Sequence, residues 1–165
     1  MNADIEAAIV AYLRVQLAPM LASFTPAAVI HGRNERAEKA IDRIFSIVAC
    51  ERLPNDVQNL WTAHLAVFVD TPFIRITDDG GAPVNLSFTH EQHSLIVRAM
   101  QWAMEPAVDA QHDAAAVTAA QLAQRAAFAP QGWVLAGVVS TESHESHTKT
   151  DWLTVLEYRA GVRKL

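Results

Sequence analysis

The chain has little of what marks secreted, membrane-bound or nucleic-acid-binding proteins. A single cysteine among 165 residues allows no internal disulfide, which is typical of a reduced intracellular protein. Thirteen lysines and arginines against 18 acidic residues give a formal net charge of -5, which argues against non-specific binding to nucleic acid or anionic membranes. No apolar run reaches the roughly 18 residues of a membrane span, and no basic leader opens the sequence. We therefore expect a cytoplasmic protein or a subunit of a soluble assembly, with no membrane partner.

The chain does contain enough apolar material for one folded unit. Hydrophobic residues make up 51% of the sequence and charged residues 19%. A chain of this length buries roughly 68–70% of its unfolded surface, so it needs no metal or disulfide to hold a core. We expect a single domain over residues 1–165, in which the Ala-rich segment 107–129 is either a thin surface helix or a mobile insertion.

Apolar residues at three- and four-residue steps predict four helices. The stretches are residues 5–21, 34–52, 89–106 and 113–128. Pro19 ends or kinks the first helix, and residues 53–56 stop the second. Thr89 and Gln92 have the spacing of a capping box at the start of the third. In the fourth, only Val117 and Leu122 are sizeable apolar anchors.

Alternating apolar and polar side chains over residues 61–69 predict a strand. Further β-rich runs are residues 25–30, 73–77, 133–141 and 152–160, with a strong turn signal at residues 78–81. The polar segment 142–150 separates the last two runs, which predicts a hairpin with a long loop. The fold class is therefore α+β: a small, mainly antiparallel β-sheet with helices packed on one face and a long C-terminal β-hairpin.

Two His-x-x-His pairs are the strongest indication of metal chemistry. His90 and His93 share a face of the predicted third helix, and His144 and His147 lie in the polar loop, so the four could complete a tetrahedral site. The opposing interpretation is that a chain with seven histidines produces such pairs by composition. Structural zinc sites more often recruit cysteine, and only Cys50 is present. We therefore assign no metal ligand.

The candidate groups for nucleophilic catalysis stand in no catalytic signature. They are Cys50, Ser87, Ser94 and Ser140, with Asp70 or Glu142 available to orient a histidine base. Cys50 lies in an apolar helical stripe, as inert core thiols do. None of the serines stands in a nucleophile elbow. The sequence thus offers no catalytic residue, no cofactor-binding residue and no cofactor, and we expect that the protein is not an enzyme.

Three features together resemble the tail-terminator or tail-completion family of long-tailed bacteriophages. They are the N-terminal helix with Asp4-Ile5-Glu6-Ala7-Ala8-Ile9, the Leu53-Pro54 step before the first long strand, and the closing hairpin from Gly132-Trp133-Val134-Leu135 to Thr150-Asp151-Trp152-Leu153-Thr154-Val155-Leu156-Glu157-Tyr158. The likeness covers most of the chain in the order and type of its elements. The Ala-rich segment 107–129 departs from a minimal family member.

The resemblance implies a structural virion protein of the tail or neck, made in the host cytoplasm. Such a protein forms a homo-oligomeric ring, typically a hexamer, that caps the tail tube and joins it to the head connector. Its partners would be the tail tube protein and the head-tail connector proteins. DNA would cross the lumen of the ring without specific binding. The family has no catalytic residues to carry over.

The polar loop is the candidate contact region for assembly. Its charged and histidine residues are Glu142, His144, Glu145, His147 and Lys149. The loop is long for a hairpin connector, so it is either an assembly-contact arm or a solvent loop. Three functions stay open: a tail-terminator-like subunit, a small metal-binding protein or metal-dependent enzyme that uses the paired histidines, and a cytoplasmic ligand-binding or regulatory domain.

Overall fold

The structure, a computed structural model, describes residues 2–23, 30–32, 47–54, 60–73, 76–77, 80, 83–84 and 88–165. The helices are α1 (Asn2–Gln16), α2 (Ala18–Ala22), α3 (His90–Met104) and α4 (Ala114–Phe128), and a 3-10 turn, η2 (Ala129–Gln131), follows α4. The strands are β1 (His31–Gly32), β2 (Ile47–Pro54), β3 (Leu60–Pro72), β4 (Ile76–Thr77), β5 (Pro83–Val84), β6 (Trp133–His147) and β7 (Asp151–Lys164). None of the helices in these ranges is long and apolar enough to cross a membrane.

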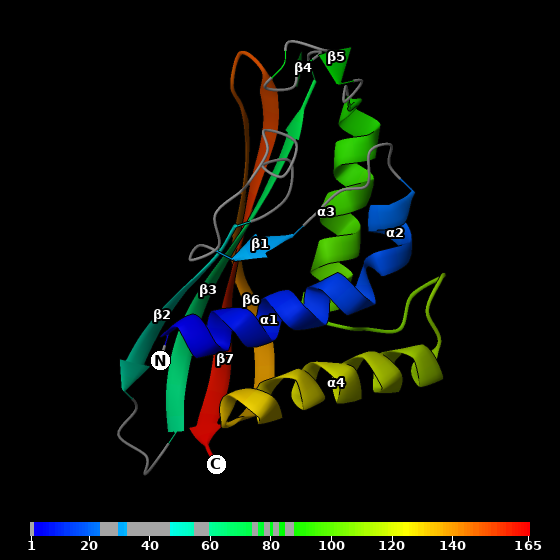
Figure 1. The fold of residues 1–165 in the computed structure, drawn as a ribbon. Coiled ribbons are helices and arrows are strands. Elements are labelled where there is room, and N and C mark those ends of the chain that lie inside the picture. The colour runs from blue at the N-terminus through cyan, green and yellow to red at the C-terminus, as the bar shows by residue number, and fades with distance from the viewer. Residues whose placement is uncertain are drawn as a thin grey trace.

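The main sheet has five strands in the order β1-β2-β3-β7-β6, and β4 and β5 form a separate pair. β1 runs parallel to β2, whereas β2, β3, β7 and β6 pair antiparallel. Figure 1 shows α1, α3 and α4 on one side of this twisted sheet, with β6 and β7 forming the long C-terminal hairpin. The predicted fold class, α+β with a mainly antiparallel sheet and helices on one face, is confirmed.

Buried and partly exposed side chains alternate along β3 and β7, so the sheet has a buried helix face and a far face. Leu65 lies opposite Tyr158, and Val67 lies opposite Leu156, and all four side chains are buried. This helix face packs against α1, α3 and α4, and its buried residues on the two strands are Ala63, Leu65, Val67, Val69, Thr71, Thr154, Leu156, Tyr158, Ala160 and Val162. The intervening side chains point to the far face and remain partly exposed. The predicted strand over residues 61–69 is confirmed.

The N-terminal helix packs on this core as predicted. Ile5, Ile9 and Leu13 recur on one side of α1 and are fully buried. The Tyr12 hydroxyl donates a 2.7 Å hydrogen bond to the Ala103 carbonyl near the end of α3, which joins the two helices. The chain then breaks into α2, where Pro19 lies in the first turn and costs no backbone hydrogen bond.

Part of the prediction for the second helix is wrong. Residues 33–46 lie outside the described residues, but Val48 and Cys50, which the prediction placed in a helical stripe, lie in strand β2. A short run of apolar residues fits both the helical period of 3.6 residues and the strand period of two. Residues 48–54 form a strand because they pair with β3. Residues 25–29 of the predicted short strand are also outside the described part, and the described strand β1 includes Gly32 rather than ending before it.

The third and fourth helices begin as predicted but are anchored differently. The Thr89 hydroxyl accepts from the Gln92 N–H, and the Gln92 side chain accepts from the Thr89 N–H, so the capping box is confirmed. α4 packs against α1 and β6. The prediction that Leu122 anchors α4 is wrong, because its side chain is 60% exposed. The buried residues of α4 are Ala120, Gln124 and Phe128.

We predict that Tyr12→Phe lowers the free energy of unfolding by about 1–2 kcal/mol, because it leaves the buried Ala103 carbonyl without its donor. Urea denaturation measures this change. Val15→Ala on the same helix is the matched control, since Val15 is 75% exposed, and it should stay within about 0.5 kcal/mol of the wild type. Equal stability of Tyr12→Phe and wild type would contradict the prediction.

Candidate functional site

The predicted polar loop over residues 142–150 is mostly strand, which corrects the sequence-based expectation. β6 continues to His147, and a short turn at residues 148–150 leads into β7. Of the five candidate contact residues, Glu142, His144, Glu145 and His147 therefore lie in β6, and Lys149 lies in the turn. The polar composition misled the prediction because β6 is an edge strand whose side chains from Val139 to His147 are all exposed. We call residues 142–153 the arm.

The turn of the arm is closed by a compact set of hydrogen bonds. The Thr148 hydroxyl accepts from the N–H groups of Thr150 and Asp151, and the Thr148 N–H donates to the Asp151 carbonyl. The Asp151 carboxylate accepts from both threonine hydroxyls. The Phe73 N–H donates to the Thr150 carbonyl at 2.9 Å, which ties the turn to the end of β3. The arm is therefore an ordered hairpin that presents Lys149 at its tip.

Two histidines at the start of α3 connect the helix to the sheet. The His93 ring is buried between two threonines, with Nδ1 2.7 Å from the Thr71 hydroxyl and Nε2 2.8 Å from the Thr154 hydroxyl. Burial lowers the pKa of His93, so the neutral ring bridges β3 and β7 by donating one hydrogen bond and accepting the other. On the surface, His90 Nε2 lies 2.7 Å from Glu145 Oε1 of the arm.

The structure does not gather the four histidines of the predicted metal site at one point. His144 lies on the far face, where its Nε2 is 3.2 Å from Glu142 Oε1, because side chains alternate along β6. His90 and His147 both contact the Trp152 ring on the helix face. Within the described ranges, no three His, Cys, Asp or Glu side chains have an arrangement that could hold a metal ion.

The candidate nucleophiles are dispersed over the fold. Cys50 lies in β2 and Ser94 in α3, whereas Ser87 lies outside the described residues. Ser140 lies on the edge of β6, where its backbone N–H makes a hydrogen bond. Neither Ser94 nor Ser140 has a histidine among its described hydrogen-bond partners. Asp70 and Glu142, the proposed orienting carboxylates, lie on the far face of the sheet.

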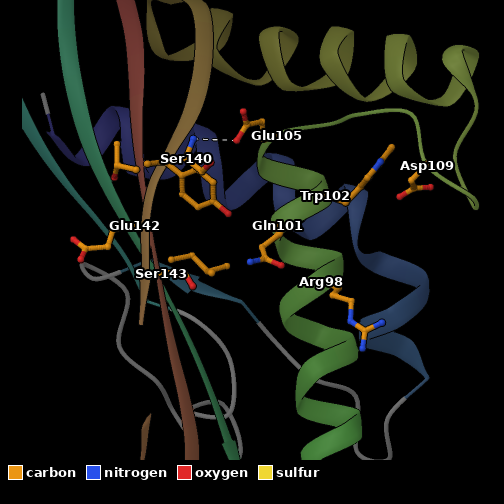
Figure 2. A pocket seen from close by; sticks show the side chains of 11 residues that line it. Arg98, Gln101, Trp102, Glu105, Asp109, Ser140, Glu142 and Ser143 are labelled. Atoms are coloured by element: carbon orange, nitrogen blue, oxygen red, sulfur yellow. Dashed lines mark hydrogen bonds between the residues drawn. The ribbon is translucent and has the colours of Figure 1, made fainter. Parts of the chain in front are cut away.

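A cleft of about 580 Å³ separates the second half of α3 from the middle of β6 (Figure 2). Its lining residues are Arg98, Gln101, Trp102, Glu105, Asp109, Ser140, Thr141, Glu142, Ser143, Leu156 and Tyr158. In Figure 2, Gln101 and Ser143 lie between α3 and β6, whereas the Glu142 carboxylate lies on the other side of β6. The Glu105 carboxylate accepts a 3.0 Å hydrogen bond from the Ser140 N–H. Burial and the nearby Glu105 carboxylate raise the pKa of Tyr158, so its phenol stays protonated.

The rim of the cleft is held by contacts within residues 102–113. The Trp102 and His112 rings stack with centroids 3.8 Å apart, and Trp102 Nε1 donates to the Ala107 carbonyl. Asp109 accepts from the backbone N–H groups of Gln111 and His112 and from the His112 ring. These hydrogen bonds lower the pKa of Asp109, and the bond from the Gln111 N–H contributes most. Asp109 therefore stays ionised.

Sequence reasoning missed this cleft, although part of its signal is present in the sequence. Arg98, Gln101, Trp102 and Glu105 stand at positions i, i+3, i+4 and i+7, which places them along one side of α3. The sequence does not reveal the opposite wall, because the polar composition of residues 142–147 predicts a loop. No protein-family model matches the chain, and a search of the curated proteins finds no match either.

We predict that Asp70→Asn stabilises the protein at about pH 7.5 and not at about pH 4. Burial, and then the nearby Asp151, raise the pKa of Asp70 from 3.8 to about 6, and its Oδ1 has no hydrogen-bond partner in the described part of the chain. A raised carboxyl pKa costs stability as the pH rises from 3.8 through 6, because the unfolded chain loses the proton more readily.

The carboxyl is half-buried and partly screened by water, so we expect a gain of about 1 kcal/mol. Denaturant unfolding of both proteins across this pH range measures the difference. A difference that does not vary with pH would show that ionisation of Asp70 is not its cause.

Proposed function

We propose that the protein is a structural subunit of a homo-oligomeric ring, similar in role to the phage tail terminators that its sequence resembles. In this role it caps the tail tube and joins it to the head connector. The observation that carries the proposal is the edge strand β6, in which nine consecutive residues, 139–147, are exposed. A long open edge of this kind is a place for pairing with another chain.

The character of the arm supports specific contact over indiscriminate aggregation. Glu142, Glu145 and two histidines are interspersed with Ser143 and Ser146 along the exposed half of β6. Charged side chains on an edge discourage pairing with unrelated strands, while the backbone of the edge can still pair with a complementary surface. In Figure 1 the tip of the hairpin lies at the upper end of the molecule, past the first turn of α3, where another subunit can reach it.

A ring can form when the β6 edge of each copy makes one contact with a different surface of the next copy. A contact between two different surfaces of identical chains propagates head to tail, and it closes into a ring when the rotation between copies allows. The net charge of -5 suits a lumen through which DNA passes without being held. Under this proposal the partners are neighbouring copies, the tail tube protein and the head-tail connector proteins.

The test is the absolute mass of the purified protein by light scattering, combined with negative-stain imaging alone and with purified tail tubes. We expect a ring of hexamer size, or a monomer that becomes a ring only at the ends of tail tubes. A stable monomer that ignores the tubes would contradict the proposed function.

A charge-changing variant tests whether the arm forms the contact. We predict that His144→Glu with Lys149→Glu strongly reduces the ring fraction, because both residues are exposed and the two changes add like charge to an acidic surface. The free energy of unfolding should stay within about 0.5 kcal/mol of the wild type. The matched control is Thr118→Glu with Arg125→Glu, which makes the same change in charge on the exposed surface of α4. Rings that survive the arm variant would exclude the arm as the contact.

A further inference from the structure

We propose that the cleft between α3 and β6 is a docking groove for an extended, positively charged segment of another protein. The segment adds to the main sheet as a sixth strand beside β6. This inference goes beyond the ring proposal, because it concerns the cleft between α3 and residues 140–143 of β6 and requires no oligomer of this chain. It rests on the direction of the β6 backbone groups, the dimensions of the cleft and its charge.

Backbone groups of β6 face the cleft. The Ser140 N–H donates to Glu105 and therefore points away from β7. The register shift between Ser140 and Glu142 leaves Glu142 opposite Glu157 and Ser143 opposite Leu156. Because backbone groups alternate along an antiparallel strand, Ser143 is the next residue after the bulge whose N–H faces the cleft. The Glu105 carboxylate thus takes the position that a carbonyl of an added strand would occupy.

The dimensions of the cleft match a short extended segment. Its α3 wall runs from Arg98 to Glu105, which is roughly 10 Å at 1.5 Å per residue. This length corresponds to about three residues of a strand. The volume of about 580 Å³ is that of a ligand-binding cleft rather than of a packing defect. The stacked Trp102 and His112 rings hold one rim in place.

The charge of the cleft selects a basic occupant. Glu105 and Asp109 line it together with one cation, Arg98. Asp109 is held in its ionised form by the hydrogen bonds of its turn. Glu142 and Glu157 add negative charge just across the sheet, where they lie directly opposite each other. A lysine or arginine on the incoming segment relieves this excess, whereas an acidic segment increases it.

A peptide pair of opposite charge tests the groove. The probe is a short fluorescein-labelled peptide in which lysine alternates with valine and threonine, and its partner has glutamate in place of each lysine. Fluorescence anisotropy at low salt should show saturable binding of the lysine peptide, with the glutamate peptide at least about tenfold weaker. Equal affinities, or no binding of either peptide, would overturn the proposal.

Three substitutions locate the binding site. Ser143→Pro removes the N–H that faces the cleft while sparing the hydrogen bonds between β6 and β7, so it should weaken the lysine peptide at least about tenfold. Ser143→Ala keeps the N–H and should change the affinity less than about twofold. Glu105→Gln keeps an acceptor for the Ser140 N–H and removes the charge. It should therefore reduce the ratio of the affinities of the lysine peptide and the glutamate peptide. Unchanged binding to Ser143→Pro would overturn the proposal.

A measurement on the unaltered protein keeps the proposal testable if Ser143→Pro does not fold. Hydrogen exchange of the Ser143 amide should slow when the lysine peptide is bound, because that N–H becomes part of a strand ladder. Unchanged exchange at a saturating peptide concentration would overturn the inference. Light scattering of the same samples reports ring formation separately, so failure of the groove and failure of the ring proposal are distinguishable.

Discussion

The register between β3 and β7 is the constraint on which the rest of the structure depends. The two strands pair from Leu60 opposite Arg163 to Pro72 opposite Asp151, and this places one row of small and apolar side chains from each strand on the same face. A slip of one residue would turn the row of one strand toward the far face and remove half of this packing surface from α1, α3 and α4. Hydrophobic burial and backbone pairing therefore select the same register.

The same register positions the surfaces that we consider functional. Because β7 is paired on both sides, β6 becomes the edge of the sheet and carries the arm beyond the start of α3. His93 holds that end of α3 to β3 and β7 through Thr71 and Thr154, and Tyr12 holds the other end through Ala103. With both ends of α3 attached to the core, the helix stands at a set distance from β6, and the cleft between them keeps its shape.

Local signals in the sequence predicted the elements that depend on short-range interactions. The capping box at Thr89, the break at Pro19 and the alternation over residues 61–69 each involve residues a few positions apart, and each is present in the structure. Predictions failed where partners distant in the sequence decide the outcome. The polarity of residues 142–147 predicts a loop, yet β7 pairs with them along their full length. In α4, Gln124 is buried through its hydrogen bond to the Met104 carbonyl, while the more apolar Leu122 is exposed.

The sequence by itself determined the fold class, the positions of most helices and strands, and the absence of a local catalytic signature. Those properties follow from composition and from periodicities of two and 3.6 residues, which require no knowledge of the partner of each segment. Only the tertiary structure decided that β6 is an edge strand, that His144 lies on the opposite face of the sheet from the other three histidines, and that α3 and β6 enclose a cleft. Each of these depends on strand order, and strand order is set by pairing and burial between segments far apart in the chain.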